Sequence, residues 1–244
     1  MLTWDERRTL IVAGDQETSL LFCAEHFLKA YQESVALHGS FSVALSGGST
    51  PKAVFALLTK SPYAAKINWS LVHLFWSDER AVDPDHPDSN FRMAMEAGFS
   101  KVAIPASHIH RMVAEQDIEI NAELYETYLR THLHGKGLDL VLLGMGEDGH
   151  TASLFPETEA LHVKDRWVVA NHVPQKNTWR MTLTFPCINA SRHIAIYVLG
   201  ESKQEMLKQI FTSKKPVFPV ELVGTVEHKA VWIADQKAAA LLPV

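Results

Sequence analysis

Apolar and polar positions along this chain repeat with two periods, one typical of helices and one typical of buried strands. Over residues 15–38 the apolar side chains recur every three or four positions, which predicts an amphipathic helix that ends at Gly39. Residues 41–45 predict a buried strand, and residues 51–58 predict a helix after a glycine-rich turn. These two segments form one strand–helix unit.

The same alternation continues to the end of the chain, after a short strand that opens it. Further strands are predicted at residues 71–76, 138–143, 167–171, 181–185, 193–199 and 230–234, and further helices at residues 89–97, 121–132 and 202–211. A wholly apolar segment such as 138–143 is typical of a strand that is buried on both faces. We therefore expect an α/β fold with an open, mainly parallel sheet and helices on both faces. Since no linker divides the chain, we expect one domain over residues 1–244.

Composition narrows the classes of partner. A hydrophobic content of 47% and a charged content of 21% are those of an ordinary globular protein. The net charge of -5 argues against a nucleic-acid or anionic-membrane binder, because such partners favour a basic surface. Cys23 and Cys187 form no CxxC pair, so a reducing cytoplasm is the expected location. The charged N-terminus predicts no secretory signal, and the apolar runs are too short to predict a membrane span.

The loops that follow strands are where ligands collect in an open parallel sheet. In the first of them, Gly47 and Gly48 let the backbone turn sharply and approach a ligand closely. Thr50 is a suitable N-cap and Pro51 suits the first helical position, so the amides of this loop, including that of Ser49, predict an anion site at the helix start. A tight structural turn is the alternative. Neither GxGxxG nor GxxxxGK[ST] occurs, which disfavours dinucleotides and nucleoside triphosphates.

Charged residues fill the loop after the next strand. Asp78 and Arg80 follow that strand directly, and Asn90 lies a short distance beyond them. Such side chains can hydrogen-bond the hydroxyl groups of a sugar, whereas a solvated loop is the alternative. The acidic run over residues 83–88 lacks the glycine and the terminal glutamate of a calcium loop, so we expect no calcium there.

A glycine-rich loop follows the most apolar strand and presents Asp148 and His150. An imidazole can accept a proton from water near neutral pH, and a carboxylate beside it can hold its tautomer and support the charge that develops. The surrounding glycines favour this catalytic interpretation over a histidine that only bonds the loop backbone.

Two further cations stand near strand ends. Arg180 precedes the strand at residues 181–185, and Lys203 lies at a strand-to-helix junction. Together with the glycine loop they predict the local positive charge that a phosphate needs.

Two HxH pairs could indicate a zinc-binding site. They are His108 with His110 and His132 with His134. Because no third ligand lies near either pair in the sequence, we expect no metal.

These motifs occur in a recognisable order. SGGSTP, SDER followed by DPDHPDSNFR, LGMGEDGHTASLFP, WRMTLTFP and GESK together resemble the 6-phosphogluconolactonases, over about residues 43–235. The motif around His150 is the most specific, and the glycine loop is shared with relatives such as the glucosamine-6-phosphate deaminases, which have an open Rossmann-like sheet. The resemblance implies hydrolysis of 6-phospho-D-glucono-1,5-lactone to 6-phospho-D-gluconate, the second step of the oxidative pentose phosphate pathway. It implies no cofactor and functional coupling to glucose-6-phosphate dehydrogenase.

The resemblance also implies roles for individual residues. His150 is implied as the general base that activates water, with Asp148 beside it. The implied phosphate-binding residues are Gly47, Gly48, Ser49, Thr50, Arg180 and Lys203. The implied substrate-binding residues are Asp78, Arg80 and Asn90.

Two other functions compete with this one. The related deaminases carry a glutamate a few residues after the histidine, whereas residues 151–156 here contain no acid. A non-catalytic sugar-phosphate sensor would keep the glycine loop but would have no need of Asp148 and His150. Both comparisons favour the lactonase.

Overall fold

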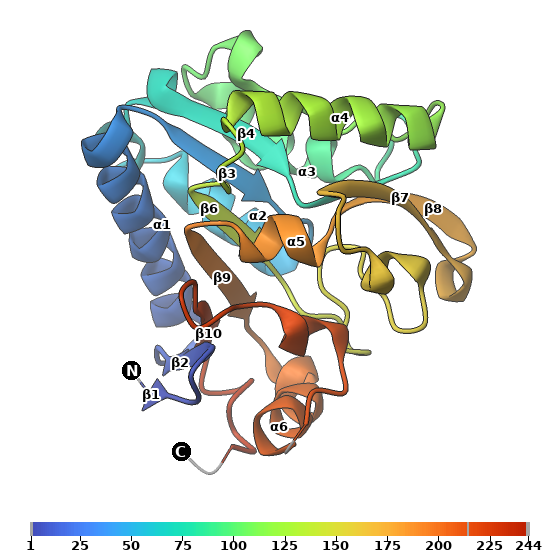
Figure 1. Ribbon diagram of the computed structural model, residues 1–244. Coiled ribbons are helices and arrows are strands. Elements are labelled where there is room, and N and C mark those ends of the chain that lie inside the picture. The colour runs from blue at the N-terminus through green and yellow to red at the C-terminus, as the bar shows by residue number, and fades with distance from the viewer. Residues whose placement is uncertain (1, 214, 243–244) are drawn as a thin grey trace.

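The central sheet has seven strands in the order β1-β2-β10-β9-β6-β3-β4 (Figure 1). The computed structural model describes residues 2–213 and 215–242. The strands are β1 (Leu2–Thr3), β2 (Arg8–Val12), β3 (Phe41–Leu45), β4 (Val72–Trp76), β6 (Leu140–Leu143), β9 (His193–Val198) and β10 (Ala230–Ala234). Every neighbouring pair is parallel except β1 and β2. The predicted open, mainly parallel sheet is confirmed.

Helices cover both faces of this sheet (Figure 1). They are α1 (Gln16–His38), α2 (Ser49–Leu58), α3 (Asn90–Ala97), α4 (Ile118–His132), α5 (Phe185–Asn189) and α6 (Gln204–Thr212). Alternate side chains of a strand point to opposite faces, and β4 shows how this places the helices. Phe75 packs against Tyr125 of α4, whereas the next residue, Trp76, packs against Phe91 of α3. Helices α3 and α4 therefore lie on opposite faces.

Local signals determine the ends of α1, while α2 begins earlier than predicted. Gly39 ends α1 in the left-handed region, with φ of 83°, as expected. Helix α2 begins at Ser49, so the prediction that Thr50 is its N-cap is wrong. Gly48 occupies the cap position with φ of 113°, a conformation that glycine adopts without strain, and this sharp turn starts the helix before Pro51. The other predicted elements are present with ends shifted by at most three residues.

A second, smaller sheet was not predicted. Its order is β5-β8-β7 and both of its pairs are antiparallel. Its strands are β5 (Asp78–Arg80), β7 (Val168–Val173) and β8 (Thr178–Leu183). The loop containing Asp78 is therefore partly a strand. The predicted strands at 167–171 and 181–185 lie in this sheet because the short turn between β7 and β8 closes them as a hairpin, as the ribbon in Figure 1 shows.

Buried apolar side chains from both sheets belong to one cluster. The one-domain expectation over residues 1–244 stays a prediction, and it includes Met1, Lys214, Pro243 and Val244, which lie outside the described residues. Within residues 2–213 and 215–242, every helix is too short or too polar to cross a lipid bilayer.

Candidate active site

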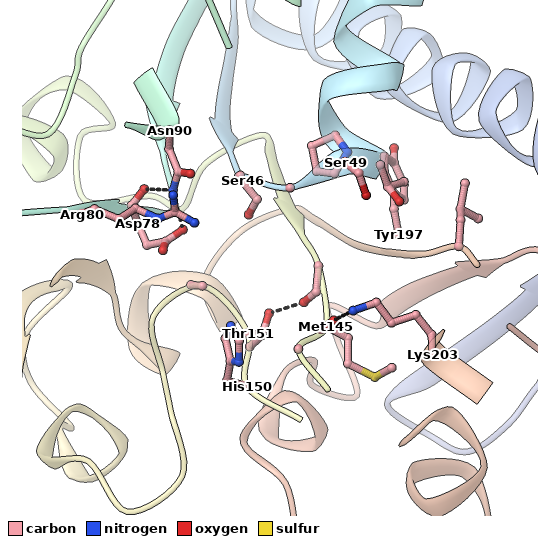
Figure 2. A pocket seen from close by; sticks show the side chains of 18 of the residues that line it. Ser46, Ser49, Asp78, Arg80, Asn90, Met145, His150, Thr151, Tyr197 and Lys203 are labelled. Atoms are coloured by element: carbon pink, nitrogen blue, oxygen red, sulfur yellow. Dashed lines mark hydrogen bonds between the residues drawn. The ribbon is translucent and has the colours of Figure 1, made fainter. Parts of the chain in front are cut away.

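A pocket of about 260 Å³ lies at the carboxyl ends of the parallel strands. The loops that line it follow β3, β4, β6 and β9, and they meet because these four strands are neighbours in the sheet. The chain leaves β3 for β4 on one side and later places β6 on its other side, so the pocket lies at a topological switch point. The predicted site residues on its walls are Gly47, Gly48, Ser49, Thr50, Asp78, Arg80, Asn90, His150, Arg180 and Lys203 (Figure 2). Asp148 lies behind His150 rather than on the wall.

His150 and Asp148 form a hydrogen-bonded pair. The Nδ1 atom of His150 lies 2.5 Å from Oδ1 of Asp148, and the same oxygen accepts the backbone N–H of His150 at 3.2 Å. The imidazole also stacks on the ring of Phe155, with centroids 3.8 Å apart. These contacts hold the ring from two sides. Because Nδ1 is engaged by the carboxylate, Nε2 is the nitrogen that remains to take a proton.

The glycine at position 146 is required by this pair. A Cβ atom there would lie 2.1 Å from His150 Nδ1 and 2.6 Å from Asp148 Oδ1, so any other residue would push the two side chains apart. Burial by itself would raise the pKa of Asp148, but the hydrogen bond from His150 and the charge of that imidazole hold it below its ordinary value. Asp148 is thus held as an anion beside the imidazole.

The first glycine loop is packed against its neighbours. A Cβ atom at Gly47 would lie 1.9 Å from Oδ1 of Asn90, so the backbone and this side chain touch at the pocket wall. Ser46 donates to the carbonyl of Leu142 at 2.7 Å, and its hydroxyl lies 2.6 Å from that of Ser77. These bonds join the ends of β3, β4 and β6. The amides at the start of α2 are therefore held in position to face a ligand.

Asp78 is almost fully buried, at 6% exposure. Its Oδ2 atom accepts a hydrogen bond from Ser153 at 2.7 Å, and its backbone carbonyl accepts one from the Asn90 side chain at 2.9 Å. Asp78 thereby ties the loop of His150 to the loop after β4. The sequence predicted Asp78 and Asn90 as site residues but carried no signal for Ser153.

Glu79 is buried in the loop after β4, and its position in the sequence did not predict the role that it has there. Its carboxylate accepts the backbone N–H groups of Arg80, Asn90 and Phe91, each at 2.8 Å, and the Ser89 hydroxyl at 3.0 Å. Burial raises the pKa of the Glu79 carboxyl, although these amides act in the opposite direction. A carboxylate that accepts four hydrogen bonds places Asn90 and Arg80 at the pocket.

We expect the Glu79→Gln substitution to destabilise the protein. Glutamine has the same shape, but its amide N–H₂ group would face backbone donors and leave at least one of them unpaired in a buried place. The expected loss in the free energy of unfolding is about 1–3 kcal/mol. Urea denaturation measures this loss, and Glu159→Gln, at an exposed position, is the matched control with no change. Equal stability of the two variants would contradict a structural role for Glu79.

Two arginines face each other across the small sheet. Arg80 of β5 and Arg180 of β8 are directly opposite in the antiparallel register, where like charges repel. The Nε atoms of both are buried, and neither has a hydrogen-bond partner among the described residues. Burial, followed by the charge of Arg80, lowers the pKa of Arg180. The two side chains form a cationic wall of the pocket, and an anion bound there would offset the repulsion between them.

Lys203 adds a further positive charge from the start of the segment after β9. Its Nζ atom donates to the backbone carbonyl of Met145 at 2.9 Å, which aims the side chain toward the loop of His150 (Figure 2). An ammonium has three donors, so this bond leaves others for a ligand. The structure thus brings the glycine loop, the arginine wall and Lys203 into one pocket with His150.

The HxH histidines lie away from this pocket. His110 and His132, one from each pair, meet His73 of β4, and ligand nitrogens of these three residues lie within 4.8 Å of one another. The expectation that no third ligand is near is therefore wrong. The third ligand comes from a strand that is distant in sequence.

Comparison with known proteins shows the family of this chain. The family described as glucosamine-6-phosphate isomerases/6-phosphogluconolactonase matches residues 14–232. A 6-phosphogluconolactonase of Nostoc sp. is 37% identical over 98% of this chain and 100% of its own. The structure of a 6-phosphogluconolactonase from Trypanosoma cruzi superposes with a TM-score of 0.87 at 26% identity, over 98% of both chains. A monomeric glucosamine-6-phosphate deaminase shares the fold, with a TM-score of 0.82 at 19% identity over 96% of this chain and 99% of its own. Because the family model covers residues 14–232 and a curated relative is 37% identical over 98% of this chain, the chain belongs to the glucosamine-6-phosphate isomerase/6-phosphogluconolactonase family.

Proposed function

We propose that this chain hydrolyses 6-phospho-D-glucono-1,5-lactone to 6-phospho-D-gluconate, the second step of the oxidative pentose phosphate pathway. The observation that carries the proposal is the meeting of the His150–Asp148 pair with a cationic, glycine-lined wall in one pocket. One part can activate water and the other can hold a phosphate. The 6-phosphogluconolactonases among its relatives support the choice of substrate.

The phosphate is held by groups at the start of α2 and by two cations. In this proposal the Gly47 and Gly48 backbone approaches the phosphate, and Ser49 and Thr50 offer amides and hydroxyls at the positive end of the helix. The phosphate-binding cations are Arg180 and Lys203. The unpartnered Nε of Arg180 supports this assignment, because a dianion supplies the acceptor that the described residues do not.

His150 acts as the general base in the first step. Its Nε2 atom takes a proton from water as the water oxygen attacks the lactone carbonyl, and a tetrahedral oxyanion forms. Asp148 holds the proton on Nδ1 and stabilises the imidazolium that results. The oxyanion then collapses, the bond from the carbonyl carbon to the ring oxygen breaks, and His150 returns the proton to that oxygen. The products are a carboxylic acid and an open-chain hydroxyl.

The loop after β4 binds the substrate hydroxyls and stabilises the negative charge that develops on the carbonyl oxygen. Arg80 is placed in the pocket by a hydrogen bond that it donates to the carbonyl of Asp88. Its Nε atom is buried without a partner among the described residues, and Arg80 lies opposite Arg180 in the small sheet. We assign Arg80 to the oxyanion, and Asp78 and Asn90 to the sugar hydroxyls.

A deaminase is the alternative within the same family. The structure of the glucosamine-6-phosphate deaminase shares only the fold at 19% identity. Ring opening of an aminosugar calls for an acid near the histidine, and residues 151–156 contain none. The Phe155 ring stacks on His150 where such an acid would follow in the sequence.

One assay separates the candidate functions. The protein is given freshly generated 6-phosphogluconolactone and, separately, glucosamine 6-phosphate, and acid release and ammonia release are followed above the uncatalysed background. We expect acid from the first substrate and no ammonia from the second. Ammonia release would establish the deaminase, and failure to accelerate either reaction would favour a sugar-phosphate sensor.

The proposal includes a cytoplasmic location and functional coupling to glucose-6-phosphate dehydrogenase. Cys23 and Cys187 are free and buried, which suits the reducing cytoplasm, and burial raises the pKa of the Cys23 thiol to about 12. The substrate is the product of glucose-6-phosphate dehydrogenase, so the two activities are functionally coupled through the lactone.

A further inference from the structure

We propose that His73, His110 and His132 form a binding site for a transition-metal ion of the zinc class. The site is separate from the catalytic pocket, with which it shares no lining residue. It does not rest on the proposed function, because no catalytic residue takes part. Neutral imidazole is a common ligand of Zn²⁺, Ni²⁺ and Cu²⁺, and a set of three histidines is sufficient to hold such an ion with one position left for water.

The spacing of the ligand atoms fits an ion. Nδ1 of His73 lies 3.2 Å from Nε2 of His110. Two nitrogens bound to one tetrahedral Zn²⁺ at 2.0–2.1 Å are about 3.3 Å apart, so these two atoms already stand at the separation of a shared metal. Nitrogen atoms of all three histidines lie within 4.8 Å of one another.

Each ligand is carried by a separate, well-anchored element. His73 is the second residue of β4, and His132 is the last residue of α4. The His110 backbone donates to the carbonyl of Leu74 at 2.8 Å, and its own carbonyl accepts the Tyr125 hydroxyl at 2.9 Å. A bound ion would therefore join the edge strand of the sheet to α4 and to the segment between them.

Polar groups and an open cavity surround the three histidines. The Tyr128 hydroxyl lies 3.5 Å from His110 Nε2, close enough to bond a water that fills the fourth position. His108 stacks on His73 with centroids 3.8 Å apart, and its buried Nδ1 has no partner among the residues described. His73 and His132 also line an open cavity of about 880 Å³, which gives an ion a path from solvent.

Metal binding to chelator-treated, tag-free protein tests the proposal. Titration with ZnCl₂ in a calorimeter is expected to show one equivalent bound with micromolar or tighter affinity. The His132→Ala variant is expected to bind at least about tenfold more weakly, because it removes one ligand from a site that is open to solvent. Added Co²⁺ is expected to give a visible absorption band in the wild type, and this band is lost in the variant.

Two control variants make the result specific. His134→Ala removes a histidine of the same cavity that is not in the cluster, and its affinity is expected to stay within about twofold of the wild type. His150→Ala is expected to retain one equivalent, which places the ion outside the catalytic pocket. Circular dichroism and lactone hydrolysis of His132→Ala are expected to match the wild type and show that it folds. The proposal is overturned if the wild type binds no equivalent, if His134→Ala weakens binding as much as His132→Ala does, or if His150→Ala abolishes it.

Discussion

Replacing His150 with alanine is expected to lower kcat about 10²–10⁴-fold while KM stays within about threefold. The imidazole contributes when the proton leaves water, which is in the transition state and not in the bound lactone. Its ring is held by Asp148 and Phe155 and lines the pocket, so its loss removes the base without removing a phosphate contact. Steady-state kinetics on freshly prepared lactone, corrected for spontaneous hydrolysis, measure both constants.

Two further variants show whether His150 acts through its pair. His162→Ala removes an exposed histidine elsewhere on the surface and is expected to leave kcat unchanged. Asp148→Asn keeps the shape of the side chain but no longer supports the imidazolium, so it is expected to lower kcat by less than His150→Ala and to leave KM unchanged. An unaltered kcat in His150→Ala would remove His150 from the mechanism.

Replacing Arg180 with alanine is expected to raise KM about 10–100-fold with a smaller effect on kcat. A hydrogen bond to a charged group contributes about 1.5–3 kcal/mol, and this range corresponds to the expected change in affinity. The phosphate stays bound throughout the reaction. Loss of Arg180 therefore weakens binding of the substrate and of the transition state to a similar extent. Arg180→Lys keeps the charge without the planar guanidinium and is expected to give an intermediate KM.

The thermal stability of Arg180→Ala is a second test of the environment of Arg180. Arg180 faces Arg80 directly, so removing it relieves repulsion between like charges in the free protein. We expect the Tm of Arg180→Ala to be no lower than that of the wild type in the absence of ligand. Arg192→Ala, at an exposed position near the amino end of β9, is the control with unchanged KM. A KM for Arg180→Ala equal to that of the control would end its assignment to the phosphate.

Residue patterns within single segments were sufficient to predict most of the helices and strands and the reactive pair. The helical period and Gly39 predicted α1, and the apolar residues 41–45 predicted β3, because such patterns record which side chains each element buries. The pairing of Asp148 with His150 was also predictable, since the two residues are two positions apart in one turn. That the strand ends would share a pocket followed from the rule for parallel sheets.

Which distant residues meet depends on packing between segments and could not be predicted from any one of them. The bond from Ser153 to Asp78, the opposition of Arg80 and Arg180 and the small antiparallel sheet depend on how separate segments pack. Local periodicity reports burial within one segment and carries no record of its partner in another. For the same physical reason, the sequence showed two HxH pairs without a third ligand, and the fold brought His73 to them.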